Sequence, residues 1–582
     1  MPPRPRSPQP KAKAPAVRVW SEPAWLRPLV VGLAALLLIG LFSTQADDSD
    51  VWWHLKTGEY ILQHHALPSP DPFSYTSNTG APAYPGEELT RQFNLTHEWL
   101  AQVLLYSLFA AGGFPAVILF RAALLAAICG ITGVLAARRS GSFYAGVVGA
   151  LAVAPVATSF TADRPPLLTF LLVAVFVLAL ELRRGLWLLP LLSLLWANFH
   201  GGFFLGWVVL AAYIAGSPKE RRLWIVALLS VAASFLNPNH WRIVEVLQLY
   251  RQSALTRALV EWKPPGLFRP PYVFDILLFG TALALLLAWR KVRVSDWLLA
   301  IAFGIAALTA FRNVLLFAML APVLIATYFP GRLKAGLETR CRRGRLPHFA
   351  AAVLLAGAFG TGLAQGRFFQ LRAAEWQYPS GAAQFLLDNR IKAPLFNLHE
   401  DGGYLIWRLW PQERVFIDGR SLSESVYQDY RRILYNRGGD PGAMTGPRVE
   451  ALNRYGVGAI VVDSFQYFDG RQYPLATALL ATSNAEWKLV YQDSQWMVFL
   501  RQPPAGMPVL ATPDPLDRLE SECLAHIEGT PKESACARTV GQLLLNARDL
   551  ARARRVLGIY LSHPHPPDPE VERVYGQLLL QR

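Results

Sequence analysis

The sequence predicts a polytopic α-helical membrane protein that carries a soluble α/β domain and a short helical tail. Of its 582 residues, 53% are hydrophobic and the mean hydropathy is +0.25, which is too apolar for an ordinary soluble multidomain chain. Long apolar runs recur as far as residue 365, and shorter alternating segments follow them. The predicted parts are a disordered cytoplasmic N-terminus (1–27), a transmembrane domain (28–365) with a first outer loop (45–114), an extracytoplasmic α/β domain (366–505) and a helical tail (506–582).

The net charge of +15 does not indicate nucleic-acid binding, because the chain has no basic run with interleaved aromatic residues. Lys and Arg instead gather in short loops, as the positive-inside rule describes for cytoplasmic loops of membrane proteins. These loops are 138–139, 183–184, 219–222, 290–293 and 332–345. They predict a cytoplasmic N-terminus and a C-terminal region on the outer side.

Eleven apolar segments are expected to cross the membrane. The first, 29–42, has a basic flank like a signal peptide, but the many later spans favour an uncleaved first span. Segment 99–111 ends at Gly112-Gly113 and is too short to cross, so it is expected to be an interfacial helix. The other ten spans are expected at 114–137, 142–159, 166–182, 186–199, 203–216, 223–236, 273–289, 295–310, 313–329 and 348–365.

The first outer loop concentrates acids, histidines and tryptophans between two apolar runs. An apolar stripe predicts an amphipathic helix that lies in the membrane interface; it consists of Val51, Leu55, Gly58 and Leu62. Asp48 and Asp50 stand at the N-terminus of this helix. His54 follows Asp50 by four residues and therefore shares its helical face.

The predicted topology brings further polar motifs to the outer face. They are Asp163-Arg164-Pro165, Asn198-Phe199-His200-Gly201-Gly202, Asn237-Pro238-Asn239-His240-Trp241, Glu261-Trp262-Lys263-Pro264-Pro265 and Arg312-Asn313. Each motif alone has an ordinary structural explanation as a helix cap, the end of a span, a tight turn or an interfacial anchor. Their convergence on one face favours a functional site for the acids and arginines, because charges at the membrane edge are costly.

This arrangement resembles the GT-C superfamily of membrane glycosyltransferases, which includes oligosaccharyltransferase catalytic subunits, protein mannosyltransferases and the lipid A aminoarabinose transferase. The resemblance rests on an acidic motif after the first span, an amphipathic helix, a short second helix and many further spans, and it covers about 28–365. A narrower group of bacterial membrane proteins described as glycosyltransferase-like is similar as far as about residue 501. The similar segments are WWHLKTGEYIL, DPFSYT, HEWL, WANFHGG, NLHEDGGYLIWRLW and FIDGR. Asp48-Ser49-Asp50 departs from the Asp-Glu pair of the mannosyltransferases, so metal-free and metal-assisted catalysis both stay open.

The chemistry of such a transfer assigns roles to the outer-face residues. A sugar on a polyprenyl phosphate reacts at headgroup level, so Asp50 or Asp48 is the candidate general base, with Asp163 as the alternative. The candidates for contact with the lipid phosphate are Arg164, Lys263 and Arg312. The remaining substrate-site candidates are His54, His97, Glu98 and His200. The first three of these would either orient the base or bind a divalent metal such as Mg²⁺ or Mn²⁺ together with the aspartates.

Beyond residue 366, strands are expected at 394–398, 414–418, 457–463, 487–491 and 496–501, with helices at 380–390, 423–436 and 475–481. His399-Glu400-Asp401 and Asp418-Gly419-Arg420 end two of these strands. They are either ligand-binding residues at the edge of the sheet or turn and cap residues.

Two helices of the tail, 535–546 and 550–561, resemble a degenerate tetratricopeptide-like hairpin. One such unit cannot bury its own apolar face, so it should pack on the α/β domain or on a partner. Cys523 and Cys536 are thirteen residues apart and are predicted to form a disulfide in an oxidising compartment.

The sequence therefore predicts an inverting membrane glycosyltransferase of the bacterial cytoplasmic membrane. It would move a sugar from a polyprenyl-phosphate donor to a glycan, lipid or protein acceptor at the outer face, with membrane lipid as its surroundings. The alternative is a non-catalytic membrane scaffold or carrier whose outer domain binds a partner.

Overall fold

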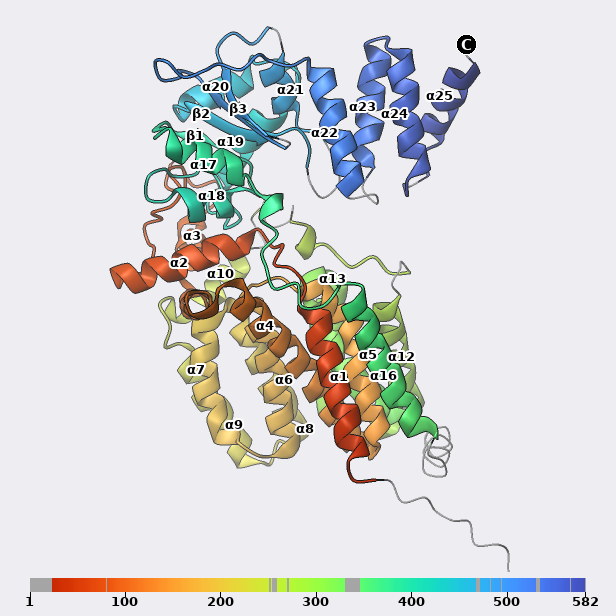
Figure 1. Ribbon diagram of the computed structural model, residues 1–582. Coiled ribbons are helices and arrows are strands. Elements are labelled where there is room, and N and C mark those ends of the chain that lie inside the picture. The colour runs from red at the N-terminus through yellow and green to blue at the C-terminus, as the bar shows by residue number, and fades with distance from the viewer. Residues whose placement is uncertain are drawn as a thin grey trace, which may run out of the picture.

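The structure is a computed structural model that describes residues 23–79, 81–250, 253, 259–268, 272–329, 346–466, 472–481, 483–493, 495–529, 534–565 and 567–580. Most of the predicted disordered N-terminus and the basic loop 332–345 lie outside the described residues. A bundle of apolar helices forms one end of the molecule, and the small sheet domain and the helical tail form the other (Figure 1).

The bundle follows the apolar runs of the sequence. Its helices are α1 (Leu26–Phe42), α4 (Trp99–Ser140), α5 (Phe143–Ala157), α6 (Pro166–Leu182), α7 (Leu189–Phe199), α8 (Phe204–Gly216), α9 (Arg221–Ser234), α12 (Val273–Leu287), α13 (Val294–Thr309), α14 (Val314–Tyr328) and α16 (Leu346–Ala364). Within the described residues, 3 helical stretches are long and apolar enough to cross a membrane, namely Glu87–Ser140, Phe143–Phe160 and Phe311–Tyr328. Several shorter apolar helices of 10–17 residues accompany them, so the total of eleven spans stays a prediction.

The basic loops among the described residues, 138–139, 183–184, 219–222 and 290–293, gather at the end of the bundle that lies away from the sheet domain. The turn between α8 and α9, which carries residues 217–220, is found there (Figure 1). Arg139 binds Asp296 with Nη2 and Oδ2 2.5 Å apart, and Arg293 binds Glu181 with Nη1 and Oε1 3.1 Å apart. These pairs join the ends of α4, α6 and α13. The described basic loops therefore share one end of the bundle, and their cytoplasmic location stays a prediction.

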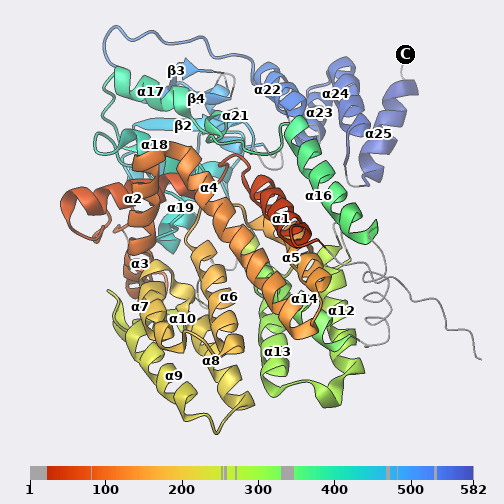
Figure 2. The ribbon, with the colours of Figure 1, turned by 60° about the horizontal axis from the view of Figure 1, so that its bottom comes forward.

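Helix α4 is divided where the sequence predicts a break. Gly112 has φ −153° and Gly113 has φ 61° and ψ −157°, so two helical segments meet at this glycine pair. The positive φ of Gly113 is accessible to glycine at little cost. The first segment therefore lies at the end of the bundle that faces the sheet domain, which we call the outer layer. The second segment enters the bundle (Figure 2).

Helix α2 (Asp50–His64) is more deeply buried than an interfacial helix. It lies against α4 on one side and α18 (Gly402–Leu409) on the other. Trp52 is 1% exposed, and its ring centroid is 5.1 Å from that of Phe114 and 4.9 Å from that of Tyr404. The expected helix exists, and the sheet domain covers one side of it. Leu62, at the C-terminal end of the apolar stripe, is 43% exposed.

Two short helices, α3 (Glu87–Thr96) and α10 (Ile243–Leu249), complete the outer layer beside the bundle.

The sheet domain contains a four-stranded sheet in the order β1-β2-β4-β3. Its strands are β1 (Leu395–Phe396), β2 (Ala459–Asp463), β3 (Lys488–Gln492) and β4 (Trp496–Leu500). β1 pairs parallel with β2, and the other two pairings are antiparallel. The accompanying helices are α17 (Ser380–Asp388), α18, α19 (Glu424–Tyr435), α20 (Pro447–Arg454) and α21 (Pro474–Leu480).

The expected strand at 414–418 is wrong, because other groups use its backbone hydrogen bonds. The Phe416 N–H donates to the side-chain oxygen of Asn397, and the Asn397 amide donates to the Ile417 carbonyl, both at 2.8 Å. On the other side, Val415 N–H donates to the Phe73 carbonyl at 3.1 Å. Segment 414–418 therefore runs between the Asn397 side chain and the first outer loop, which is inserted against this domain.

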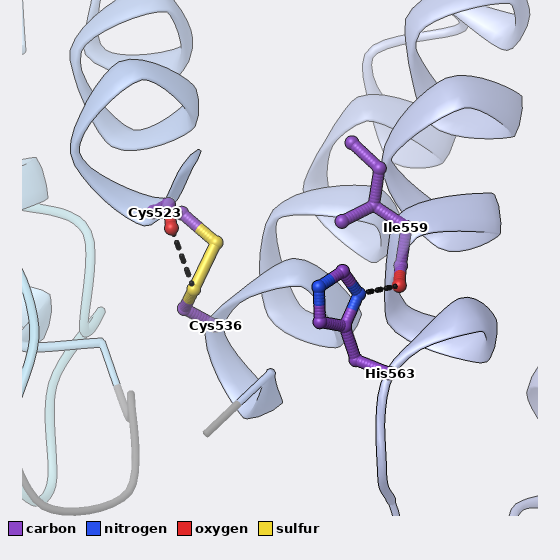
Figure 3. The surroundings of a disulfide bond; sticks show 4 residues. All are labelled: Cys523, Cys536, Ile559 and His563. Carbon is purple, nitrogen blue, oxygen red and sulfur yellow. Dashed lines mark hydrogen bonds between the residues drawn. A yellow bond between two sulfur atoms is a disulfide. The ribbon is translucent and has the colours of Figure 1, made fainter. Parts of the chain in front are cut away.

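The tail consists of four helices, α22 (Pro515–Gly529), α23 (Ala535–Asn546), α24 (Leu550–Ser562) and α25 (Pro569–Leu580), which lie side by side in both ribbon views (Figures 1 and 2). Cys523 and Cys536 form a disulfide with Cα atoms 5.6 Å apart, which confirms the predicted pairing (Figure 3). The tail packs on the sheet domain, since Arg518 donates to the Asp493 carbonyl at 3.0 Å and Phe465 belongs to the apolar core of the tail. Its likeness to tetratricopeptide repeats stays a prediction.

Candidate functional site

Arg164 binds both aspartates of the acidic motif. Its Nε donates to Oδ2 of Asp48 and its Nη2 donates to Oδ1, each at 2.5 Å. Its Nη1 lies 2.9 Å from Oδ2 of Asp50. Asp48 lies just before the N-cap of α2 and Arg164 just before the N-cap of α6, so the start of two helices positions these groups. The structure thus brings Arg164 to a motif that lies up to 116 positions earlier in the sequence.

The charged network continues from Arg164 to a second arginine. Oε2 of Glu261 is 3.9 Å from Nη1 of Arg164, and its Oε1 is 3.1 Å from Nη1 of Arg312. The Arg312 guanidinium lies over the ring of Trp262, 4.6 Å from its centroid. Lys263, the third predicted phosphate-binding residue, has an exposed side chain, and its carbonyl accepts a hydrogen bond from Phe311. Negative and positive side chains therefore alternate from the aspartates through Arg164 and Glu261 to Arg312.

A cavity of about 510 Å³ opens beside the two arginines. Arg164, Glu261 and Arg312 line it together with His97 and His200. Much of its remaining wall is apolar, from α6, α8, α10 and α14; examples are Phe170, Leu205, Leu247 and Leu316. Such a cavity suits an amphiphilic ligand with a charged head and an apolar body. Asp48 and Asp50 do not line it, and Arg164 connects them to it.

Glu98 is the centre of a buried histidine cluster. Its Oε1 lies 3.2 Å from Nε2 of His97 and 3.7 Å from Nε2 of His200, and its Oε2 lies 3.9 Å from Nδ1 of His54. Burial would raise the pKa of Glu98, but the charge and hydrogen bond of His97, the closest histidine, hold that pKa below its ordinary value. Glu98 is therefore a carboxylate at neutral pH.

The hydrogen bonds of His200 define which ring nitrogen carries its proton. Its Nδ1 accepts from Gly202 N–H at 3.0 Å and lies 2.8 Å from the Thr169 hydroxyl, whose oxygen accepts from Trp196 Nε1 at 2.8 Å. We assign the proton to Nε2, which faces Glu98. Burial lowers the pKa of His200 to about 3 and that of His54 to about 4, so both rings are neutral.

Asp163 lies apart from this network. Its Oδ2 accepts from Nη1 of Arg121 at 2.7 Å, and Arg121 also donates to the Thr161 carbonyl at 2.6 Å. Both side chains are almost fully buried, and Asp163 does not line the cavity. Asp163 is therefore held by Arg121 at the start of α6, and its role as the alternative base stays a prediction.

The sheet domain reaches the acidic motif through Gly419. A Cβ atom at this position would lie 2.0 Å from Oδ1 of Asp50, so the backbone of this loop rests directly against the carboxylate. Arg420 holds the loop in place, with Nη1 2.7 Å from Oδ1 of Asp71 and Nε 2.7 Å from Oδ1 of Asp418. The sequence marks 418–420 as a motif, but its contact with Asp50 is not evident from a separation of more than 360 residues.

The two aspartates differ in basicity. Burial raises the pKa of Asp50 above its ordinary value; Arg164 opposes this rise and the Asp48 charge adds to it. Burial acts on Asp48 as well, but its two hydrogen bonds to Arg164 hold its pKa below the ordinary value. Asp50 is therefore the more basic of the pair.

The described residues contain no group of three or more His, Cys, Asp or Glu side chains arranged to hold a metal ion. The oxygens of Asp48 face the Arg164 guanidinium, and Glu98 is surrounded by imidazole rings. Both oxygens of Asp48 are therefore engaged by Arg164.

No protein-family model and no curated protein matches this chain. Solved structures do match. The apo oligosaccharyltransferase of Archaeoglobus fulgidus has a TM-score of 0.52 at 13% sequence identity, over 83% of this chain and 75% of that one. Archaeal oligosaccharyltransferase AglB from Archaeoglobus fulgidus, in complex with an inhibitory peptide and a dolichol-phosphate, has a TM-score of 0.52 at 12% identity, with the same coverage. Both neighbours are archaeal, so a bacterial source stays a prediction. At these identities the likeness shows the fold alone, which this chain shares with these archaeal oligosaccharyltransferases.

Proposed function

We propose that this chain is a membrane glycosyltransferase that uses a lipid-linked sugar donor, with the cavity beside Arg164 as the donor site. One observation carries the proposal: a guanidinium that binds two carboxylates also lines an amphiphilic cavity. Its mixed wall matches a donor with an anionic head and an isoprenoid body. The structural neighbour that is in complex with a dolichol-phosphate and a peptide supports the same class of ligand.

In the proposed reaction, a polyprenyl-phosphate sugar places its phosphate near Arg164 and Arg312. Asp50 takes the proton of an acceptor hydroxyl, and the freed oxygen attacks the anomeric carbon. The bond between that carbon and the phosphate oxygen breaks, and the negative charge that develops on the leaving phosphate is stabilised by the two arginines. A single displacement of this kind inverts the configuration at the anomeric carbon.

The proposed location is a cytoplasmic membrane, with the N-terminus inside and the sheet domain and tail outside. In this orientation the charged edge of the cavity lies at the outer headgroup level, where the phosphate of a lipid-linked sugar is found. The acceptor is a hydroxyl or amide of a glycan, a lipid or a protein that approaches from the sheet-domain side.

Replacing Asp50 with Asn tests the proposal. The substitution keeps the shape of the side chain but removes its basicity, so we expect transfer to fall on the order of a hundredfold or more. The measurement is transfer from a radiolabelled polyprenyl-phosphate sugar by the full chain in proteoliposomes, with the melting temperature as the test of folding. Asp388→Asn, an exposed change on α17, is the matched control and should transfer at the wild-type rate.

A non-catalytic scaffold makes the opposite prediction. If the aspartates only cap α2, Asn is itself a good cap, and both Asp50→Asn and Asp48→Asn should behave like wild type. Wild-type transfer by both variants would remove the catalytic role from this motif.

A further inference from the structure

Arg164 binds both aspartates of the acidic motif, and the proposed reaction does not explain why. A pair of carboxylates two residues apart, such as Asp48 and Asp50, resembles the ligand set of a hard divalent cation. Here, however, both oxygens of Asp48 and one oxygen of Asp50 face N–H groups of a single guanidinium. We propose that Arg164 takes the place of a divalent cation at this motif, so that the chain binds its lipid-linked donor without a metal ion; this deepens the proposed function and rests on it.

The geometry of the Arg164–Asp48 pair is that of a specific contact. The guanidinium presents two parallel N–H groups to the two oxygens of Asp48, at equal distances of 2.5 Å. Such a bidentate pair is stronger and more directional than a single ion pair. The Asp50 backbone N–H is the third donor to the Asp48 carboxylate, and it binds Oδ1 at 3.3 Å. A metal ion could reach Asp48 only if it displaced the guanidinium.

Two neighbouring acids are also paired with arginines of the chain. Asp163 is bound to Arg121, and Glu261 is bound to Arg312. Glu98 faces three histidines. A Mg²⁺ or Mn²⁺ site usually combines several oxygen ligands in near-octahedral geometry. Four of the carboxylates that could contribute to one here, Asp48, Asp50, Asp163 and Glu261, already have an arginine partner.

Arg164 is also placed to do what a cation would do for the donor. Burial disfavours its charge, but Asp48 and Asp50 raise the pKa of Arg164 far above its ordinary value, so it is permanently charged. Its side chain is 32% exposed and lines the cavity. Its Nη1 and Nη2 each carry a second N–H beyond those used by the aspartates, and these can bind phosphate oxygens. The two aspartates fix the orientation of the guanidinium, and its remaining N–H groups face the cavity in which the donor would bind.

Mn²⁺ binding to the purified full chain in detergent tests this inference. Mn²⁺ is chosen because the free ion gives a strong paramagnetic resonance signal that is lost on binding. We expect the wild type to bind no more Mn²⁺ than the Asp48→Asn/Asp50→Asn double variant. Arg164→Gln removes the guanidinium and leaves the two carboxylates uncompensated, so it should bind Mn²⁺ roughly tenfold more tightly or better.

Arg312→Gln is the matched control. It removes the other arginine of the same cavity but leaves Arg164 on the aspartates, so it should not gain Mn²⁺ at this motif. The gain in Arg164→Gln should disappear when Asp48→Asn is added.

One equivalent of Mn²⁺ bound by the wild type and lost in Asp48→Asn would overturn the inference. This result needs no Arg164 variant, so it is informative even if Arg164→Gln fails to fold. The readout is independent of transfer, and it therefore distinguishes failure of this inference from failure of the proposed function.

Discussion

Asp48 and Asp50 show how two carboxylates in one motif acquire different properties. Asp48 gives both oxygens to the fork of Arg164, whereas Asp50 has one ion-pair contact and lies under the backbone of Gly419. The sequence favours Asp50 as the base because His54 shares its helical face. The structure favours the same residue for another reason, since His54 faces Glu98 and Gln102. Burial beneath the sheet domain is what raises the pKa of Asp50.

Gly419→Ala tests this contact at the scale of one residue. The new Cβ would lie 2.0 Å from Oδ1 of Asp50, so the carboxylate or the loop must move. Because displacement of a reacting group by about 1 Å can cost on the order of a hundredfold in rate, we expect transfer to fall toward that extent. The assay is transfer in proteoliposomes alongside thermal unfolding.

Gly576→Ala is the control for this substitution, because a Cβ at Gly576 would meet no atom within 4 Å. It should leave transfer unchanged. Wild-type activity in Gly419→Ala would show that this loop does not position Asp50.

At the scale of secondary-structure elements, apolar runs and punctuating residues predict much of the chain. The bundle helices follow the apolar runs, the division of α4 falls at Gly112-Gly113, and the tail helices α23 and α24 begin at the predicted residues. What the sequence does not contain is which element covers which face. The cover that α18 provides for α2 is not predicted, and the segment expected as a strand at 414–418 is instead bound by the side chain of Asn397.

The candidate site likewise has residues that the sequence predicts and contacts that it does not. Outer-face residues such as Arg164, Glu261 and Arg312 are identified because a charge at the membrane edge is costly. Their mutual pairing, the burial of Asp163 against Arg121 and the contact of Gly419 all depend on tertiary distances that no local pattern records.

The disulfide of the tail permits a prediction about two elements. Cys523 in α22 and Cys536 in α23 are separated by 13 residues, and a cross-link of that size typically contributes about 2–3 kcal/mol to the stability of the part it joins. Replacing both cysteines with Ser should make the tail unfold at a lower temperature and should leave transfer intact. Limited proteolysis against temperature, read by mass spectrometry, would show earlier cleavage within 515–580.

Reducing agent supplies the control for the cysteine variant. It should speed cleavage of the wild-type tail and have no effect on the double variant. Equal protease resistance of both proteins under oxidising conditions would contradict a stabilising role for this bond.

At the scale of the whole molecule, the bundle has two chemically distinct ends. One end carries the pairs Arg139–Asp296 and Arg293–Glu181, and the other carries Arg164 with its aspartates. Because basic loops are retained in the cytoplasm, the first end is expected inside and the second outside.

Reporter fusions test this orientation. Fusions after Arg139, after Arg184 and after Arg343, which lies outside the described residues, should report the cytoplasm. A fusion after Gln370, where the chain leaves α16 for the sheet domain, should report the outside. An outside signal at Arg139 or Arg343 would reject the two-sided arrangement, and with it the outer location of the cavity.

The insertion of the first outer loop against the sheet domain has a consequence for how the protein is made. The hydroxyl of Ser74 donates to the carbonyl of Phe416, a contact between residues 342 positions apart, and Arg420 binds Asp71 across 349 positions. At about 5–20 residues per second, the ribosome needs roughly 20–70 s to add that much chain. During this interval the loop has crossed the membrane but its partner has not been translated. The outer layer therefore cannot fold in the order in which it is synthesised, and the early loop must remain soluble and unpaired until most of the bundle has been inserted.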